Sequence, residues 1–175
     1  MKCSCRSLLV VALVLPLAVY GCGRRGKTQI GDDWIDFVHR EGNFKVRMPK
    51  RPNNSLSKDG KEKRFRAQYQ GGEHLVQVSY QKNADVGVSL QDRLAAVINL
   101  SSVQKSTKPT KFTAGNVTGY EAKYDLKSGR TVVRMRHRIF YHDGTMYQLL
   151  AAAPKDEFNN ADTDRFFSSF QLTSE

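Results

Sequence analysis

The stretch that decides the fold runs from residue 131 to residue 152 and reads TVVRMRHRIFYHDGTMYQLLAA. In its first half, apolar residues alternate with polar ones, mainly arginines, which predicts a half-buried β-strand over Thr131 to Tyr141. Asp143-Gly144 is a strong signal for a short β-hairpin turn. The second half, Met146 to Ala152, is apolar on both faces, so we predict that it forms the central strand of a sheet.

Other segments repeat the strand pattern on both sides of this hairpin. Alternation predicts strands over residues 44–48, 64–69 and 74–82, which we expect to form an antiparallel meander, and over 111–114 and 119–126. The polar residues 51–61 are interpreted as a turn region.

Two segments have the signature of helices. The period changes to 3.6 over Leu90 to Val103, and Ser89 with Asp92 matches a capping box. A final helix is predicted to begin at Pro154, and the chain closes on a short apolar end around Phe170. This order predicts an α+β fold, mainly an antiparallel β-sheet with two packed helices.

The first 22 residues have the pattern of an export signal. Two basic residues, Lys2 and Arg6, precede an apolar run over residues 8–19. This run is too short to cross a bilayer as a helix. The run ends in Val19-Tyr20-Gly21-Cys22, which resembles the lipobox of bacterial lipoproteins. The resemblance implies a signal peptide over 1–21 and lipidation of Cys22, the new N-terminus. The alternative is an ordinary secretory signal with an incidental cysteine near the cleavage site.

Composition restricts what the remaining chain can do. We expect residues 22–33 to be the anchor and a flexible tether, and residues 34–175 to be a single α+β globular domain. The other two cysteines, Cys3 and Cys5, lie in the signal, so the mature domain has no thiol for a disulfide, a zinc site or nucleophilic catalysis. The formal net charge is +11, and +9 remains once Lys2 and Arg6 are removed with the signal.

A resemblance to a known family spans residues 42 to 172. It is carried by the opening Gly42-Asn43-Phe44-Lys45-Val46-Arg47-Met48-Pro49, the hairpin at Asp143-Gly144 and the closing Phe166-Phe167-Ser168-Ser169-Phe170-Gln171-Leu172. These segments are similar to the PsbP-like superfamily, which includes the extrinsic PsbP protein of photosystem II and bacterial lipoproteins of the LpqN type. The resemblance implies an α/β/α sandwich that serves as a binding or assembly scaffold, without a shared catalytic centre.

Side chains that carry chemistry are scattered. The histidines His39, His74, His137 and His142 have no metal-ligand spacing, and we expect neither a metal nor a cofactor. His137 lies in phase with the apolar residues of its strand, so we predict a partly buried histidine there with its hydrogen bonds satisfied. Ser168 and Ser169 lack the glycine-flanked elbow of a hydrolase, and we predict that the protein is not an enzyme.

Basic residues, by contrast, fall on one phase of three predicted strands. If these strands share a sheet, one face carries seven cations and suits an anionic ligand. They are Lys45, Arg47, Arg64, Arg66, Arg134, Arg136 and Arg138. Glu121 and Asp125 have the same phase on their strand and would neutralise part of the charge. The alternative is a solvated polar face whose charges pair across strands.

Two functions are compatible with these features. The first is a non-enzymatic, membrane-tethered binding or assembly module of the bacterial cell envelope, held to a membrane by its N-terminal lipid, with an envelope protein as a candidate partner. The second is a carrier or sensor of an anionic lipid or acidic polysaccharide that uses the basic face. A carrier predicts a concave pocket beside the basic strands, whereas a scaffold predicts a flat exposed patch. Nucleic acid is disfavoured as a partner, because an exported domain does not ordinarily meet it and the basic strands lack exposed aromatic residues.

Overall fold

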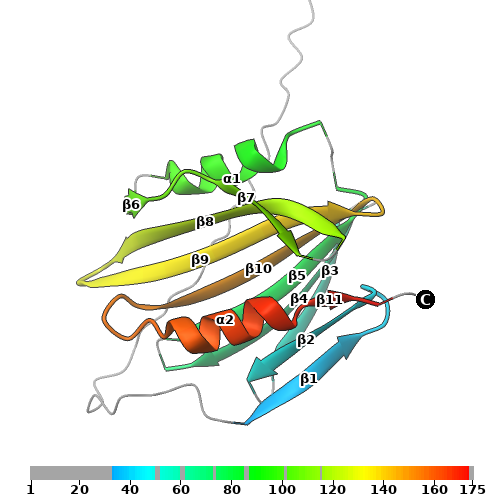
Figure 1. Cartoon of the computed structure of the whole chain (residues 1–175), viewed down its shortest axis with the longest axis horizontal. Helices are drawn as coiled ribbons and strands as arrows, with labels where there is room; N and C mark the ends of the chain where they lie inside the picture. The colour runs from blue at the N-terminus through cyan, green and yellow to red at the C-terminus, as the bar shows by residue number, and fades with distance from the viewer. Residues whose placement is uncertain are drawn as a thin grey trace, which may run out of the picture.

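Figure 1 shows the computed structural model of the chain, which describes residues 33–49, 52–59, 62–72, 74–84, 87–100, 102–114 and 116–173. The predicted signal peptide over 1–21, the predicted lipidation site Cys22 and the tether up to residue 32 lie outside the described residues. Within the described part of the chain, no helix has the length and apolar character needed to cross a membrane.

A large antiparallel sheet forms the centre of the fold. Its strand order is β3 (Asn53–Asp59), β4 (Glu62–Gly71), β5 (His74–Lys82), β10 (Thr145–Pro154), β9 (Thr131–His142), β8 (Val117–Ser128) and β6 (Val103–Ser106). The short strand β7 (Thr110–Ala114) pairs with β8 beside β6. A second sheet has three strands in the order β1 (Trp34–His39), β2 (Phe44–Pro49) and β11 (Gln171–Leu172).

Each face of the large sheet carries its own hydrophobic core. Helix α1 (Leu90–Ile98) packs on β8 and β9, and its buried Leu94 and Ile98 belong to the core on that face. The small sheet and helix α2 (Asn160–Ser169) cover the other face, where Phe44 of β2 and Phe166 of α2 are fully buried in one core. The structure therefore confirms the predicted α+β fold with two packed helices.

The central hairpin is formed as the sequence predicts. Strand β10 lies between β5 and β9 and is buried along nearly its whole length. The turn Asp143-Gly144 has φ values of 45° and 69°, the left-handed conformation that a two-residue hairpin turn requires. Because both faces of β10 are apolar, burying it requires a layer on each side of the sheet.

The predicted meander is wrong for one strand. β4 and β5 pair with each other as expected, but β2 belongs to the small sheet and pairs with β1 and β11. The apolar side of β2 faces α2 and the large sheet as a second layer. Alternation along β2 predicts its buried side correctly, yet it cannot tell which sheet the strand joins.

Several boundaries also differ from the sequence prediction. Helix α1 ends at Ile98, capped by Asn99, and residues 103–106 form strand β6 instead of continuing the helix. Helix α2 begins at Asn160, after the N-cap Asn159, whereas Pro154 ends strand β10. The interpretation of residues 51–61 as a turn region is wrong, because residues 53–59 form the edge strand β3, and strand β1 is an addition to the predicted elements. Both are edge strands that are hydrogen-bonded through the backbone with little apolar alternation.

His137 occupies the buried position that its phase predicts. Its side chain is 2% exposed within the core under α1, and its Nε2 lies 3.0 Å from Gln148 Oε1. Burial lowers the pKa of His137 to about 4, because the interior disfavours the imidazolium.

This burial predicts a loss of stability in mild acid. The unfolded chain takes up a proton at His137 near pH 6.5, while the folded chain resists protonation down to about pH 4. The contribution is therefore complete above pH 6.5 and is lost as the pH falls, by on the order of 3 kcal/mol at pH 4. Urea unfolding of the wild type and of His137→Leu across this range should show a shallower pH dependence for the variant. Equal pH dependence of the two proteins would contradict the prediction.

Candidate functional site

The seven basic residues proposed from the sequence do not share one face. Lys45 and Arg47 lie on β2 in the small sheet, where Arg47 Nε is 3.4 Å from Asp36 Oδ1. The largest group that shares a strand and a face is Arg134, Arg136 and Arg138, at alternate positions along β9. The expectation of a single basic sheet face is therefore wrong.

Strand register shows that Arg64 and Arg66 of β4 point to the opposite face from the β9 arginines. Arg66 pairs with Ser79, Ser79 pairs with Gln148, and Gln148 pairs with Ile139. Residues directly opposite each other share a face, whereas Ile139 and Arg138 are neighbours on one strand and point to different faces. The β4 arginines thus lie on the α1 face, and the β9 arginines lie on the α2 face.

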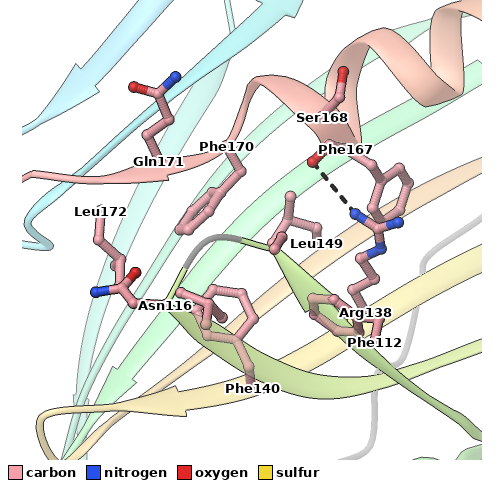
Figure 2. A pocket seen from close by; sticks show the side chains of 12 residues that line it. Phe112, Asn116, Arg138, Phe140, Leu149, Phe167, Ser168, Phe170, Gln171 and Leu172 are labelled. Carbon is pink, nitrogen blue, oxygen red and sulfur yellow. Dashed lines mark hydrogen bonds between the residues drawn. The ribbon is translucent and has the colours of Figure 1, made fainter.

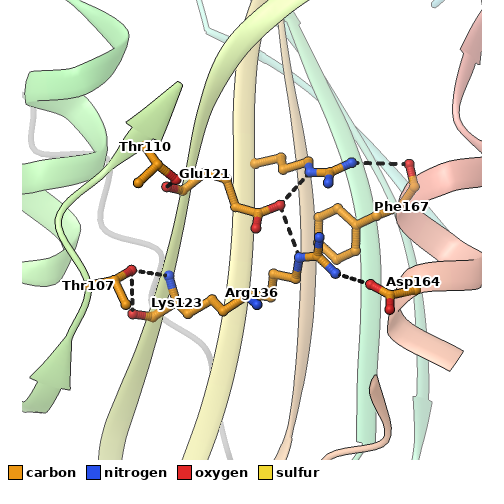
Figure 3. Close-up of polar contacts among 8 residues, drawn as sticks. Thr107, Thr110, Glu121, Lys123, Arg136, Asp164 and Phe167 are labelled. Atoms are coloured by element: carbon orange, nitrogen blue, oxygen red, sulfur yellow. Dashed lines mark hydrogen bonds and ion pairs between the residues drawn. The ribbon is translucent and has the colours of Figure 1, made fainter. Parts of the chain in front are cut away.

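Glu121 of β8 holds two of the β9 arginines together. Its Oε2 accepts hydrogen bonds from Arg136 Nε at 3.0 Å and from Arg138 Nε (Figure 3). Arg136 also donates through Nη1 to Asp164 of α2. The side chains of Glu121, Arg136 and Arg138 are only 14%, 12% and 18% exposed. The guanidinium groups are therefore paired with carboxylates beneath α2 instead of facing solvent.

The third arginine is neutralised separately. Arg134 donates from Nε and Nη2 to the two carboxylate oxygens of Asp125, at 3.0 and 3.3 Å. Lys155 Nζ lies 3.4 Å from the same carboxylate. The Arg134 hydrogen bonds hold the pKa of Asp125 below its usual value, so this buried group stays charged. The sequence expectation that Glu121 and Asp125 would neutralise part of the charge agrees with these contacts.

Aromatic rings hold the Arg138 guanidinium from both sides. Its Cζ lies 4.8 Å from the ring centre of Phe112 on β7 and 5.0 Å from that of Phe167 on α2. Arg138 Nη1 also donates to the Phe167 carbonyl at 3.4 Å, near the C-terminal end of α2, where carbonyl dipoles favour a cation. These contacts fix the guanidinium in one position.

A pocket of about 410 Å³ opens beside this guanidinium (Figure 2). Its walls come from β7, β8, β9, β10, the end of α2 and β11, and they are mostly apolar. The lining residues are Phe112, Ala114, Asn116, Val117, Arg138, Phe140, Leu149, Phe167, Ser168, Phe170, Gln171 and Leu172. We call this cavity the Phe112 pocket.

The walls of the Phe112 pocket are set by close packing. Phe112 pairs with Gly119 across β7 and β8, and a Cβ at Gly119 would lie 2.3 Å from the Ile139 carbonyl oxygen. This position therefore needs glycine. The Phe112 ring lies over Gly119 and packs edge to face against the Phe140 ring, with 6.4 Å between the ring centres. On the far wall, the Phe170 ring contacts Phe140 at 5.2 Å. The pocket is thus preformed by packed rings.

The arrangement suits noncovalent binding of an apolar group. Rings and aliphatic side chains offer burial, and the guanidinium of Arg138 offers a hydrogen-bonding group at the wall. Among the described residues, no group of three or more His, Cys, Asp or Glu side chains is placed to hold a metal ion.

Sequence reasoning missed the pocket although it found one of its residues. Arg138 was singled out by charge, whereas Phe112 is a single aromatic residue in a polar strand and gave no pattern. Phe167 and Phe170 were recognised only as core and family-resemblance positions. Their convergence depends on the contact between α2 and the large sheet, which no local periodicity encodes.

Comparisons with known proteins identify the fold. No family model matches the sequence, and no curated protein matches it. The solution structure of cyanobacterial PsbP (CyanoP) from Synechocystis sp. PCC 6803 is similar with a TM-score of 0.55 and 13% identity, over 86% of this chain and 98% of that chain. The crystal structure of LpqN, involved in cell envelope biogenesis of Mycobacterium tuberculosis, matches with a TM-score of 0.47 and 14% identity, over 83% of this chain and 82% of that chain. The likeness to CyanoP confirms the predicted PsbP-like fold.

Because Glu121 accepts hydrogen bonds from two arginines, we predict that its substitution strongly lowers the free energy of unfolding. Glu121→Gln leaves two largely buried guanidinium groups without their common carboxylate, so we expect a loss of about 2–4 kcal/mol in the free energy of unfolding. The matched control is Asp164→Asn, which removes a carboxylate that is 66% exposed and should cost less than about 1 kcal/mol. Urea unfolding measures both. Similar losses for the two variants would contradict a special role of Glu121.

Proposed function

We propose that this chain is a non-enzymatic, membrane-tethered binding module of the bacterial cell envelope. In this proposal the Phe112 pocket takes the apolar part of the ligand. The observation that carries the proposal is the preformed apolar pocket beside a fixed guanidinium.

The size and lining of the pocket support a binding role. Its volume of about 410 Å³ falls within the range of about 300–1,000 Å³ that is usual for small-molecule sites. Mostly apolar walls with a few polar groups are typical of sites that bind by burial and orient their ligand by a few hydrogen bonds. The polar groups here are Asn116, Arg138, Ser168 and Gln171. Packed rings on two sides reduce the ordering cost of binding.

The sequence supports the membrane tether. Residues 19–22 match a lipobox, and two or three acyl chains on Cys22 would hold the protein durably on a membrane. The tether then places the domain close to the membrane surface, so that it meets ligands of the envelope at a high effective concentration.

One observation favours a second candidate, a carrier or sensor of an anionic lipid. A concave pocket beside a basic strand is the feature that separates a carrier from a flat scaffold, and Arg138 of β9 lies in the pocket wall. An anionic head group would contact the guanidinium while the apolar part enters the pocket. Of the seven cations proposed from the sequence, this candidate uses only Arg138.

Filling the pocket should abolish binding of an apolar probe. We expect wild-type protein to bind the neutral fluorophore N-phenylnaphthylamine, and Ala114→Trp to lose this binding because the indole occupies the cavity. The matched control is Thr113→Trp, an exposed position next to it on β7 that does not line the pocket. Fluorescence titration measures both, with thermal melting to verify folding. Equal binding by the two tryptophan variants would exclude the pocket as the site.

The carrier candidate makes a separate prediction about charge. Anilinonaphthalene sulfonate has a similar ring system with an added anion, so a carrier should bind it about 10-fold more tightly than the neutral probe. Arg138→Gln should remove this preference while leaving neutral-probe binding nearly unchanged. If the two probes bind equally well to wild type, the simple binding module stands and the anionic-lipid carrier does not.

Lipidation of Cys22 is tested directly. In a bacterial host fed with labelled fatty acid, the wild-type chain should carry the label, and its intact mass should equal residues 22–175 plus the acyl groups. Cys22→Ser should lose the label, whereas Cys5→Ser should keep it. An unmodified N-terminus, or cleavage away from Cys22, would refute the anchor.

A further inference from the structure

The excess positive charge of the protein is concentrated in one segment. Residues 103–138 contain nine lysines and arginines but only two carboxylates, so they hold a net charge of +7 out of the +9 of the mature chain. The two carboxylates are Glu121 and Asp125, which are engaged by the β9 arginines. Within the residues that the structure describes, the other cations of the segment form no ion pair with either carboxylate, although Lys105 lies opposite Asp125 in register.

Six cations remain after the three β9 arginines are counted as neutralised. All six are exposed, and none of them forms an ion pair with a carboxylate among the described residues. They are Lys105, Lys108, Lys111, Lys123, Lys127 and Arg130, which we call the basic edge. This set shares no member with the seven residues proposed from the sequence.

Backbone contacts arrange the basic edge as a row along β8. The Thr107 amide donates to the Lys123 carbonyl at 2.8 Å, and the Lys123 amide donates to Thr107 Oγ1 at 3.0 Å (Figure 3). This reciprocal contact places Lys108, which follows Thr107, beside Lys123, whereas Lys105 lies opposite Asp125 on the same strand. Toward one end of the row, Lys111 pairs with Tyr120 across β7 and β8, so its side chain projects from the α1 face of the sheet edge, whereas Lys123 projects from the α2 face.

The other end of the row is fixed in the same way. The Lys127 amide donates to the Ser102 carbonyl at 2.9 Å, and Arg130 lies in the turn between β8 and β9. Because the row runs from the level of Tyr120 to the turn after Ser128, it extends over about 30 Å. Neighbouring charges within it lie within roughly one Debye length, so their fields add along the strand.

We propose that the basic edge binds a linear polyanion, namely an acidic polysaccharide of the cell envelope. A narrow row of charges matches repeated anionic groups along an extended polymer. The first described strand, β1, begins at Trp34, and Figure 1 shows β1 at the bottom of the view and β8, with β6 and β7, toward the top. The basic edge thus lies on the side of the domain away from Trp34, near the start of the described chain, and we assign this side to the polymer. This surface is separate from the Phe112 pocket, so the two proposals can fail independently.

The test uses the full chain anchored in phosphatidylcholine vesicles and fluorescent polygalacturonate in solution. We expect wild-type vesicles to bind the polymer at low ionic strength, with an affinity that falls steeply as salt is added. The triple variant Lys105→Glu, Lys108→Glu, Lys111→Glu should bind at least about 100-fold more weakly. A chain that fails to anchor is detected before the polymer is added, so failure of the tether is distinct from failure of this proposal.

The matched control reverses the same number of charges at exposed positions elsewhere, with Lys45→Glu, Lys58→Glu and Arg66→Glu. It should keep binding within about fivefold of wild type, because distant charges are screened. An equal loss in both variants would mean that net charge alone attracts the polymer, and this would overturn the proposal.

A second arm asks whether the partner is a lipid surface. Labelled phosphatidylglycerol vesicles replace the polymer, and their capture by the anchored chain is measured. The capture of these vesicles and the binding of polygalacturonate are each compared between the Lys→Glu triple variant and its charge-reversal control. If only the vesicle capture is weaker for the triple variant than for the control, the partner is a lipid surface and the proposal is overturned. A Lys→Gln triple variant at residues 105, 108 and 111 is compared in parallel, so that a variant that folds is available for the same measurement.

Discussion

The constraint on which the structure depends is the apolar character of β10 on both of its faces. A strand without a polar side cannot lie on the surface of a two-layer protein, so the large sheet must be covered on each side where β10 runs. Helix α1 and its core cover one side, and the small sheet with α2 covers the other. The closing residues 166–172 are therefore part of the layer that makes the central hairpin stable.

Covering the second face determines the chemistry of β9. The even-numbered residues of this strand point toward α2, and Arg134, Arg136 and Arg138 occupy those positions. Guanidinium groups can be buried there only if carboxylates accompany them, and Glu121 and Asp125 of β8 are directly opposite in register. Because Glu121 is shared and aromatic rings enclose Arg138, one guanidinium becomes a fixed wall of the Phe112 pocket. The pocket thus follows from how the arginines are buried.

In this chain, local sequence patterns predict individual strands and helices. They do not predict which strands pair with each other or in what register. The β9–β10 hairpin, the start of α1 at its cap and the burial of His137 could be derived from the sequence. Alternation also separates the basic residues correctly from the apolar side of each strand. It does not determine which sheet the strand joins, or from which face of that sheet the basic side chains project. The site was therefore only partly predictable: Arg138 was visible as a charge, whereas Phe112 acquires its role through the long-range packing of α2 on the sheet.

Strand β8 links the interior charges to the exposed ones. Glu121 and Asp125 share a sheet face with Lys123 and Lys127, but their carboxylates are hydrogen-bonded to the β9 arginines, and neither lysine forms an ion pair with them in the part of the chain that the structure describes. These two carboxylates pair with the arginines beneath α2. Because they are used there, the exposed lysines at the outer edge of the sheet have no ion-pair partner among the described residues. An exposed row of like charges is repulsive unless a counter-charge reaches it. The basic edge is thus the electrostatic consequence of stabilising the arginines under α2, and an external polyanion is what would complete it.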